Sequence, residues 1–181
     1  IPTISSIKPY SPLELQGRDL YIREGCVSCH SQMIRPFRSE TERYGEYSKA
    51  GEFVYDHPFL WGSKRIGPDL AREGDKYSNA WHFNHLLDPQ TMSPGSIMPP
   101  YEWLINQKLD TTTTSAKINA MRTLGVPYQL GFENKANSHL NNQAKEIAAD
   151  LRKSNVRVQS DKEIIAIIAY LQRLGTDIKA K

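Results

Sequence analysis

Two cysteines and a histidine within five residues constrain this chain more than any other feature. The chain of 181 residues has only two cysteines, and they lie three positions apart in Cys26-Val27-Ser28-Cys29-His30. A disulfide across two intervening residues would stabilise almost nothing, because loop-closure stabilisation grows with loop length. The stretch matches the C-x-x-C-H signature of c-type haem, in which both thiols bind the haem and the histidine binds its iron. It predicts one covalent haem c at Cys26 and Cys29, with His30 as an axial ligand.

Two other kinds of site use cysteines at this spacing. A thioredoxin-like redox pair needs a βαβ context, and no strand-rich pattern surrounds the motif. A zinc site needs a second pair of ligands at short spacing, and His82 and His85 could supply it. Both alternatives stay open, although the haem motif is the more specific signal.

The segments at the two ends of the chain predict helices that pack together. Residues 13–24 lead into the motif, with Gly17 one turn before Tyr21. A glycine there lets another helix approach closely. Residues 163–174 repeat apolar side chains at helical spacing and form the clearest helix in the sequence.

Local signals mark the limits of the last helix and three further helices. Ser160 followed by Glu163 predicts a capping box, and Gly175 predicts the end of the helix. The other predicted helices cover residues 79–87, 115–123 and 141–153. The fold class that follows is mostly α.

A methionine is the expected ligand on the far side of the iron. Met33 is too close to His30 to reach that side, and Met121 lies in an apolar helical stripe that suits core packing. Met98 lies in the stiff loop Pro94-Gly95-Ser96-Ile97-Met98-Pro99-Pro100 and is the favoured ligand. Met92 is the alternative.

These features resemble class I cytochromes c. The Gly67-Pro68-Asp69-Leu70 segment is similar to the family's Gly-Pro-x-Leu turn, which implies that the Pro68 carbonyl accepts a hydrogen bond from His30. The pairing of Gly17 and Tyr21 with Tyr170 resembles the crossing of the terminal helices in that family. The loop around Met98 resembles its methionine loop.

Residues 31–65 form a long insertion that makes the resemblance specific to one kind of cytochrome c. Together with Lys8-Pro9-Tyr10 and Leu124-Gly125-Val126-Pro127-Tyr128, the insertion resembles the monohaem cytochrome c subunit, of FixO or CcoO type, of cbb-type haem–copper oxidases. The similarity covers roughly residues 8–175.

The resemblance implies a fold, partners and a location. It implies a class I cytochrome c-like domain over residues 13–181, with an extra helical segment at about 110–160. Residues 1–12 would follow an N-terminal membrane anchor that the sequence lacks, and the domain would lie in the periplasm. The implied partners are the haem–copper catalytic subunit and a dihaem cytochrome c subunit. The chain would then transfer electrons and would not be an enzyme by itself.

Composition limits the other functions. The longest apolar run, residues 164–171, is shorter than the ~20 residues that span a membrane. A formal charge of +3 gives no support for nucleic-acid binding. Arginines and aromatic residues are frequent in residues 35–65, which favours a docking surface over a solvated loop. A loop that only covers the haem is the alternative there, and a freely diffusing electron carrier is the alternative function.

Overall fold

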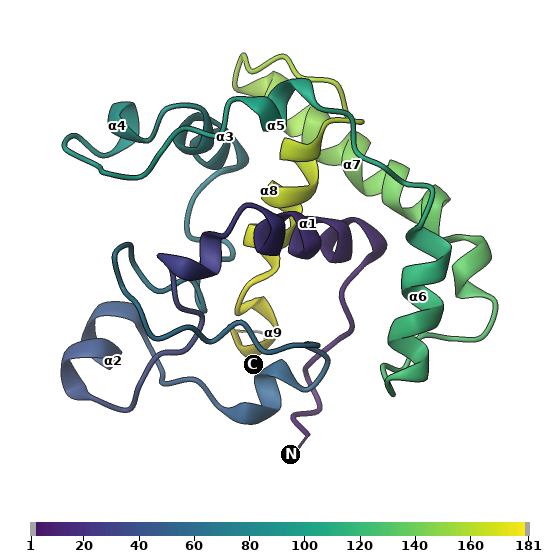
Figure 1. Ribbon diagram of the computed structural model, residues 1–181, viewed down its shortest axis with the longest axis horizontal. Coiled ribbons are helices and arrows are strands. Elements are labelled where there is room, and N and C mark those ends of the chain that lie inside the picture. Colours follow the sequence, from purple (N-terminus) through teal and green to yellow (C-terminus); the bar gives the residue numbers. More distant parts are fainter. Residues whose placement is uncertain (1–2, 180–181) are drawn as a thin grey trace.

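Helices form the regular structure of the described chain, apart from one isolated bridge between Lys108 and Lys162. The structure is a computed structural model that describes residues 3–179 (Figure 1). The α-helices are α1 (Pro12–Arg23), α2 (Arg38–Tyr44), α3 (Asn79–Leu87), α4 (Pro89–Met92), α5 (Trp103–Asn106), α6 (Thr114–Thr123), α7 (Ala136–Lys153), α8 (Glu163–Arg173) and α9 (Thr176–Lys179). Three 3-10 helices are η1 (Cys26–Ser28), η2 (Ala50–Phe53) and η3 (Phe132–Asn134). The predicted mostly α fold is confirmed. None of the helices within residues 3–179 has the length and apolar character needed to cross a membrane.

Helix α1 begins at a complete capping box. The Ser11 hydroxyl accepts a hydrogen bond from the Glu14 backbone N–H at 3.2 Å, and the Glu14 carboxylate accepts one from the Ser11 N–H at 2.8 Å. Pro12 occupies the first turn, where its missing N–H costs nothing. The helix predicted over residues 13–24 is thus confirmed to within one residue at each end.

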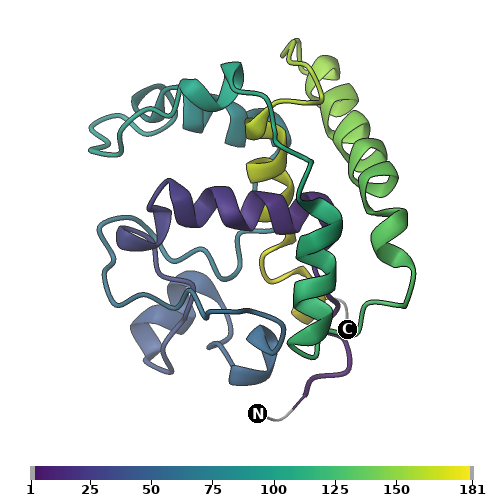
Figure 2. The same cartoon turned by 45° about the vertical axis from the view of Figure 1, so that its right-hand side comes forward.

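Helices α1 and α8 cross in close contact (Figure 2), and Gly17 lies at the crossing point. A Cβ atom on Gly17 would lie 1.9 Å from the carbonyl oxygen of Ala166 and 2.8 Å from Cβ of Tyr170. The Tyr21 and Tyr170 rings meet edge to face beside this point, with centroids 5.3 Å apart. The crossing predicted from these residues is confirmed, and only a glycine fits it.

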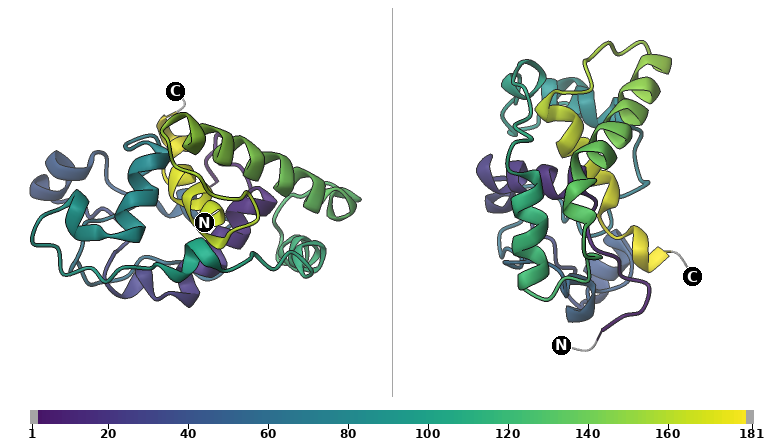
Figure 3. Two further views of the ribbon diagram at one scale, coloured as in Figure 1. Left: turned by 90° about the horizontal axis from the view of Figure 1, so that it is seen from above. Right: turned by 90° about the vertical axis from the view of Figure 1, so that its right-hand side faces the viewer.

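Helix α8 is the centre of the main core. Residues 163–171 are all buried, and α1, α3, α5 and α7 pack around them (Figure 3). A helix that is apolar on all sides has no solvent face and must be covered in this way.

The predicted capping box at the start of α8 is wrong. The helix begins at Glu163 after Lys162, without a side-chain cap. The Glu163 carboxylate instead accepts hydrogen bonds from Arg23 at the end of α1, at 2.8 Å from Nη1 and 2.5 Å from Nη2. Gly175 follows the end of the helix with φ of 76°, in agreement with its predicted role.

Helices α6 and α7 form a second, smaller core beside α1. Its buried residues are Leu15, Ile118, Met121, Val126 and Ala136, so Met121 packs as predicted. The helices predicted over 79–87 and 115–123 agree with α3 and α6. Helix α7 begins at Ala136 rather than at residue 141, because Ala136 and Leu140 extend the buried i, i+4 series of the helix through its polar first turn.

The insertion is less irregular than predicted, because it contains α2 and η2. Only Glu40 is buried among the residues of α2, so the helix shows no apolar period in the sequence. The insertion is attached to α1 through Arg18, whose guanidinium pairs with buried Asp56 at 3.2 Å and donates to the His57 carbonyl at 3.2 Å.

Replacing Gly17 by alanine should destabilise the protein, whereas the same change at an ordinary helical site stabilises it. We expect Gly17→Ala to lower the free energy of unfolding by about 1–3 kcal/mol, because the methyl group forces α1 and α8 apart. Ala149→Gly, at an exposed site within α7, is the control and should cost about 1 kcal/mol through helix propensity alone. Denaturant unfolding monitored by circular dichroism measures both. A Gly17→Ala protein as stable as its parent would contradict the close crossing.

Candidate haem-binding site

The C-x-x-C-H motif lies in a tight turn directly after α1. Gly25, with φ of 73°, ends the helix and lets the chain enter η1. The backbone N–H groups of Cys29 and His30 both donate to the carbonyl of Cys26, at 3.1 Å and 2.9 Å. Both thiols are free and partly buried, so they are available for a covalent bond to a ligand.

The His30 imidazole is held in one orientation by the segment that follows the insertion. Its Nδ1 lies 2.8 Å from the carbonyl oxygen of Pro68. A carbonyl can only accept, so Nδ1 carries the proton and the lone pair of Nε2 is left to bind a metal. Burial lowers the pKa of His30, against the opposing effects of the Pro68 hydrogen bond and the charge of Asp69. The neutral form, which binds iron, is therefore favoured.

The backbone of Gly67 packs directly against the imidazole ring of His30. A Cβ atom there would lie 2.2 Å from Cε1 and 2.7 Å from Nδ1 of the imidazole. Any side chain at this position would push the ring away from Pro68.

Met98 lies in the loop between α4 and α5, which is tied to α3 by a 2.8 Å hydrogen bond from the Tyr101 N–H to the Leu86 carbonyl. Met98 is partly buried and packs against the main core, as Cys26 and Val27 do. Met92, the alternative ligand, ends α4 and is not among the residues found against that core within 3–179.

Helix α3 contributes the polar ring atoms of two histidines that the sequence offered only as zinc ligands. His82 Nε2 and His85 Nδ1 are buried without a hydrogen-bond partner among residues 3–179. Burial, followed by the charge of nearby His30, lowers the pKa of His85, so α3 and the motif lie close together. The His85 ring stacks on the Trp81 ring, with centroids 4.6 Å apart.

The two alternative sites find no support. Within residues 3–179 no three His, Cys, Asp or Glu side chains come together to hold a metal ion, so His82 and His85 do not complete a zinc site with the cysteines. The part of the chain described has no βαβ unit, and burial raises the pKa of Cys26 to about 12. A reactive dithiol requires a lowered thiol pKa.

The donor set fits a c-type haem. It offers two free thiols, an oriented imidazole with its Nε2 available and a thioether on a separate loop packed against the same core. These are the groups that hold haem in c-type cytochromes with methionine ligation.

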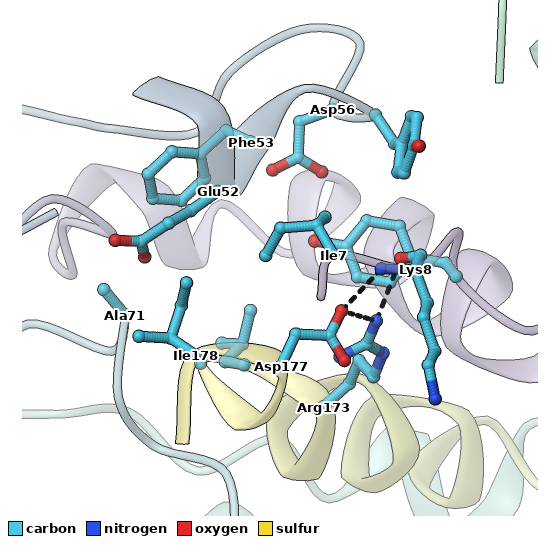
Figure 4. Close-up of a pocket in the computed structure, with 13 residues that line it drawn as sticks. Ile7, Lys8, Glu52, Phe53, Asp56, Ala71, Arg173, Asp177 and Ile178 are labelled. Atoms are coloured by element: carbon cyan, nitrogen blue, oxygen red, sulfur yellow. Dashed lines mark hydrogen bonds and ion pairs between the residues drawn. The ribbon is translucent and has the colours of Figure 1, made fainter. Parts of the chain in front are cut away.

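A separate small cavity lies away from these residues, between the N-terminal segment and α8 and α9 (Figure 4). Its volume is about 50 Å³, and none of the predicted haem ligands lines it. Asp177 closes it by accepting hydrogen bonds from the Lys8 N–H at 2.7 Å and from Arg173 Nη2 at 2.5 Å. The space suits ordered water rather than a cofactor.

Comparison with known proteins agrees with the fold and the motif. A family model described as cytochrome C oxidase, mono-heme subunit/FixO, matches residues 1–178. No match is found among curated protein sequences. Because the family match spans nearly the whole chain, its helical fold is of the cytochrome c-like class, and the chain belongs to the FixO family of mono-haem, electron-transfer subunits of cytochrome c oxidase.

Proposed function

We propose that the chain carries single electrons through one covalently bound, low-spin haem c, from the dihaem cytochrome c subunit to the haem–copper catalytic subunit of a cbb-type oxidase. The observation that carries the proposal is the 2.8 Å contact between His30 Nδ1 and the Pro68 carbonyl, directly after two free thiols, in a member of the FixO family. In this account the subunit is not an enzyme by itself, because oxygen is reduced in the catalytic subunit.

Five residues have assigned roles. Cys26 and Cys29 form thioether bonds, His30 Nε2 binds one face of the iron and Met98 binds the other, while Pro68 fixes the imidazole. The haem, when bound, supplies a one-electron iron couple. The stiff loop around Met98 holds its thioether in place, and the partial burial of Met98 against the core limits the access of water.

A basic cavity beside the site supports docking to another oxidase subunit. It has a volume of about 500 Å³ and is lined by Arg35, Ser39, Glu40, Arg43, Tyr44, Arg65, Ile66, Gly67 and Pro68. Three guanidinium groups thus face one carboxylate, Glu40, which already pairs with Arg35 and Arg65.

The rim of this cavity has the character of an interface. Arg43 lies over the Tyr44 ring at 5.0 Å, and it forms no ion pair within residues 3–179. Phe37 and Ile66 are each 57% exposed nearby. Exposed aromatic, apolar and arginine side chains are typical of interfaces, and the excess of positive charge favours an acidic partner surface. Because Gly67 and Pro68 contact His30, a partner docked here lies close to the haem.

The family assignment also supports a location. Members act in a membrane oxidase, and we place the domain on the periplasmic side of the bacterial inner membrane, where c-type haem is attached. An N-terminal anchor and the boundary at residue 12 remain predictions from the sequence.

Substituting Met98 tests the assignment of the axial ligand. In the reduced parent protein both axial positions are filled, so carbon monoxide should bind slowly or not at all. Met98→Leu should open the sixth position, allow rapid carbon monoxide binding and lower the reduction potential, because the thioether favours ferrous iron. Met92→Leu is the matched control and should behave as the parent. Rapid binding by the parent, or an effect at Met92 instead of Met98, would refute the assignment.

Reversing one charge tests the docking surface. Arg43→Glu should weaken assembly at least about tenfold, since a like charge then faces the acidic partner. The yield of this chain co-purified with the tagged haem–copper subunit, at several salt concentrations, measures the effect. Arg152→Glu, on α7 at the opposite side of the molecule from α2 (Figure 1), is the control and should assemble normally. Equal assembly of the two variants would favour a loop that only covers the haem.

A further inference from the structure

Asp69 is a charged residue at a completely buried position, directly after the carbonyl that holds His30. Its side chain has 0% exposure. Such a carboxylate is costly to bury unless donors surround it. The Asp69 carboxylate therefore needs a structural or functional explanation.

The segments before and after the insertion are paired on both sides of His30. The Gly67 N–H donates to the Cys29 carbonyl at 3.0 Å, and the Leu70 N–H donates to the Ser31 carbonyl at 2.9 Å. His30 lies between the two acceptors, and Pro68 lies between the two donors. The 2.8 Å contact between the imidazole and the Pro68 carbonyl thus depends on the register of these segments.

The Asp69 carboxylate locks that register. Its Oδ2 accepts hydrogen bonds from the Ser31 hydroxyl at 2.6 Å and from the Met33 N–H at 2.8 Å. Its Oδ1 accepts one from the Ala71 N–H at 2.8 Å, and Arg65 Nη2 lies 3.5 Å from Oδ2. One side chain therefore joins the residues directly after the haem motif to the segment that carries Pro68.

The charge of Asp69 also reaches the imidazole. The carboxylate accepts a hydrogen bond from the hydroxyl of Ser31, the residue after His30, and it follows Pro68, whose carbonyl contacts the ring, so a negative group lies near the imidazole. Ferric haem carries one more positive charge than ferrous haem, so the same carboxylate stabilises the oxidised state.

We infer that Asp69 is a positioning residue for the axial histidine, which holds the Pro68 carbonyl on Nδ1 of His30 and, by its fixed charge, lowers the reduction potential of the haem. The inference rests on the proposed haem at His30. Both effects act in one direction, because a firm hydrogen bond from Nδ1 raises the basicity of the ligand and also favours ferric iron.

Asp69→Asn keeps the shape of the side chain and removes its charge. We expect a more positive reduction potential, and an exchange of the His30 Nδ1–H with solvent that is about tenfold faster in the ferrous protein, measured by NMR with ¹⁵N-labelled histidine. Glu73→Gln is the matched control, because Glu73 is also a buried carboxylate in the segment after Pro68, and its ion-pair partner is Lys76, outside the hydrogen bonds of Asp69. It should leave the potential and the exchange rate close to those of the parent even if the protein is destabilised.

A second variant covers the case in which Asp69→Asn fails to fold. Ser31→Ala keeps the carboxylate and removes one of its donors, so it should speed the exchange of the His30 proton while raising the potential less than Asp69→Asn. Unchanged potential and exchange in the Asp69 and Ser31 variants, or equal shifts in Glu73→Gln, would overturn the inference. A parent protein that carries no haem at Cys26 and Cys29 would instead overturn the proposed function.

Discussion

The close approach of α1 and α8 at Gly17 determines where the candidate haem site lies. It fixes the direction of α1, and the motif follows the end of that helix by a single turn. Two further contacts extend from the crossing into the site. The Tyr21 hydroxyl donates to the His30 carbonyl at 3.4 Å, and the Gln32 amide donates to the Tyr170 hydroxyl at 3.0 Å. The motif is therefore attached to the pair of helices through side chains on both of them.

Buried polar groups hold the insertion against this frame together with the buried apolar side chains of Ile34, Phe53 and Leu60. Arg18 and Asp56 attach its second half to α1, while Asp69 joins its two ends. Each of these carboxylates has its donors in place, as the cost of burying a charge demands. The contacts of Asp69 also join the residues after the motif to the segment of Pro68, whose carbonyl oxygen lies 2.8 Å from His30 Nδ1.

The sequence predicted those parts of the fold that local patterns encode. The apolar period of α8, the glycine of the helix crossing and the Gly67-Pro68 turn each carry their information within a few residues. It could not predict contacts between distant segments. Ser160 looked like the cap of α8 because nothing nearby shows that Glu163 pairs with Arg23, 140 positions earlier. Helix α2 has no apolar period, and the donors around Asp69 come from both sides of the insertion. The haem ligands themselves remain predictions.

The central claim is a single haem bound covalently at Cys26 and Cys29. The most direct test is mass spectrometry of the tryptic peptide 24–38, which remains whole because Pro36 protects Arg35 from cleavage. In protein produced with a c-type haem maturation system, we predict that this peptide gains the mass of one haem and has no thiol left for alkylation. A peptide of unmodified mass, with both cysteines alkylated, would contradict the account.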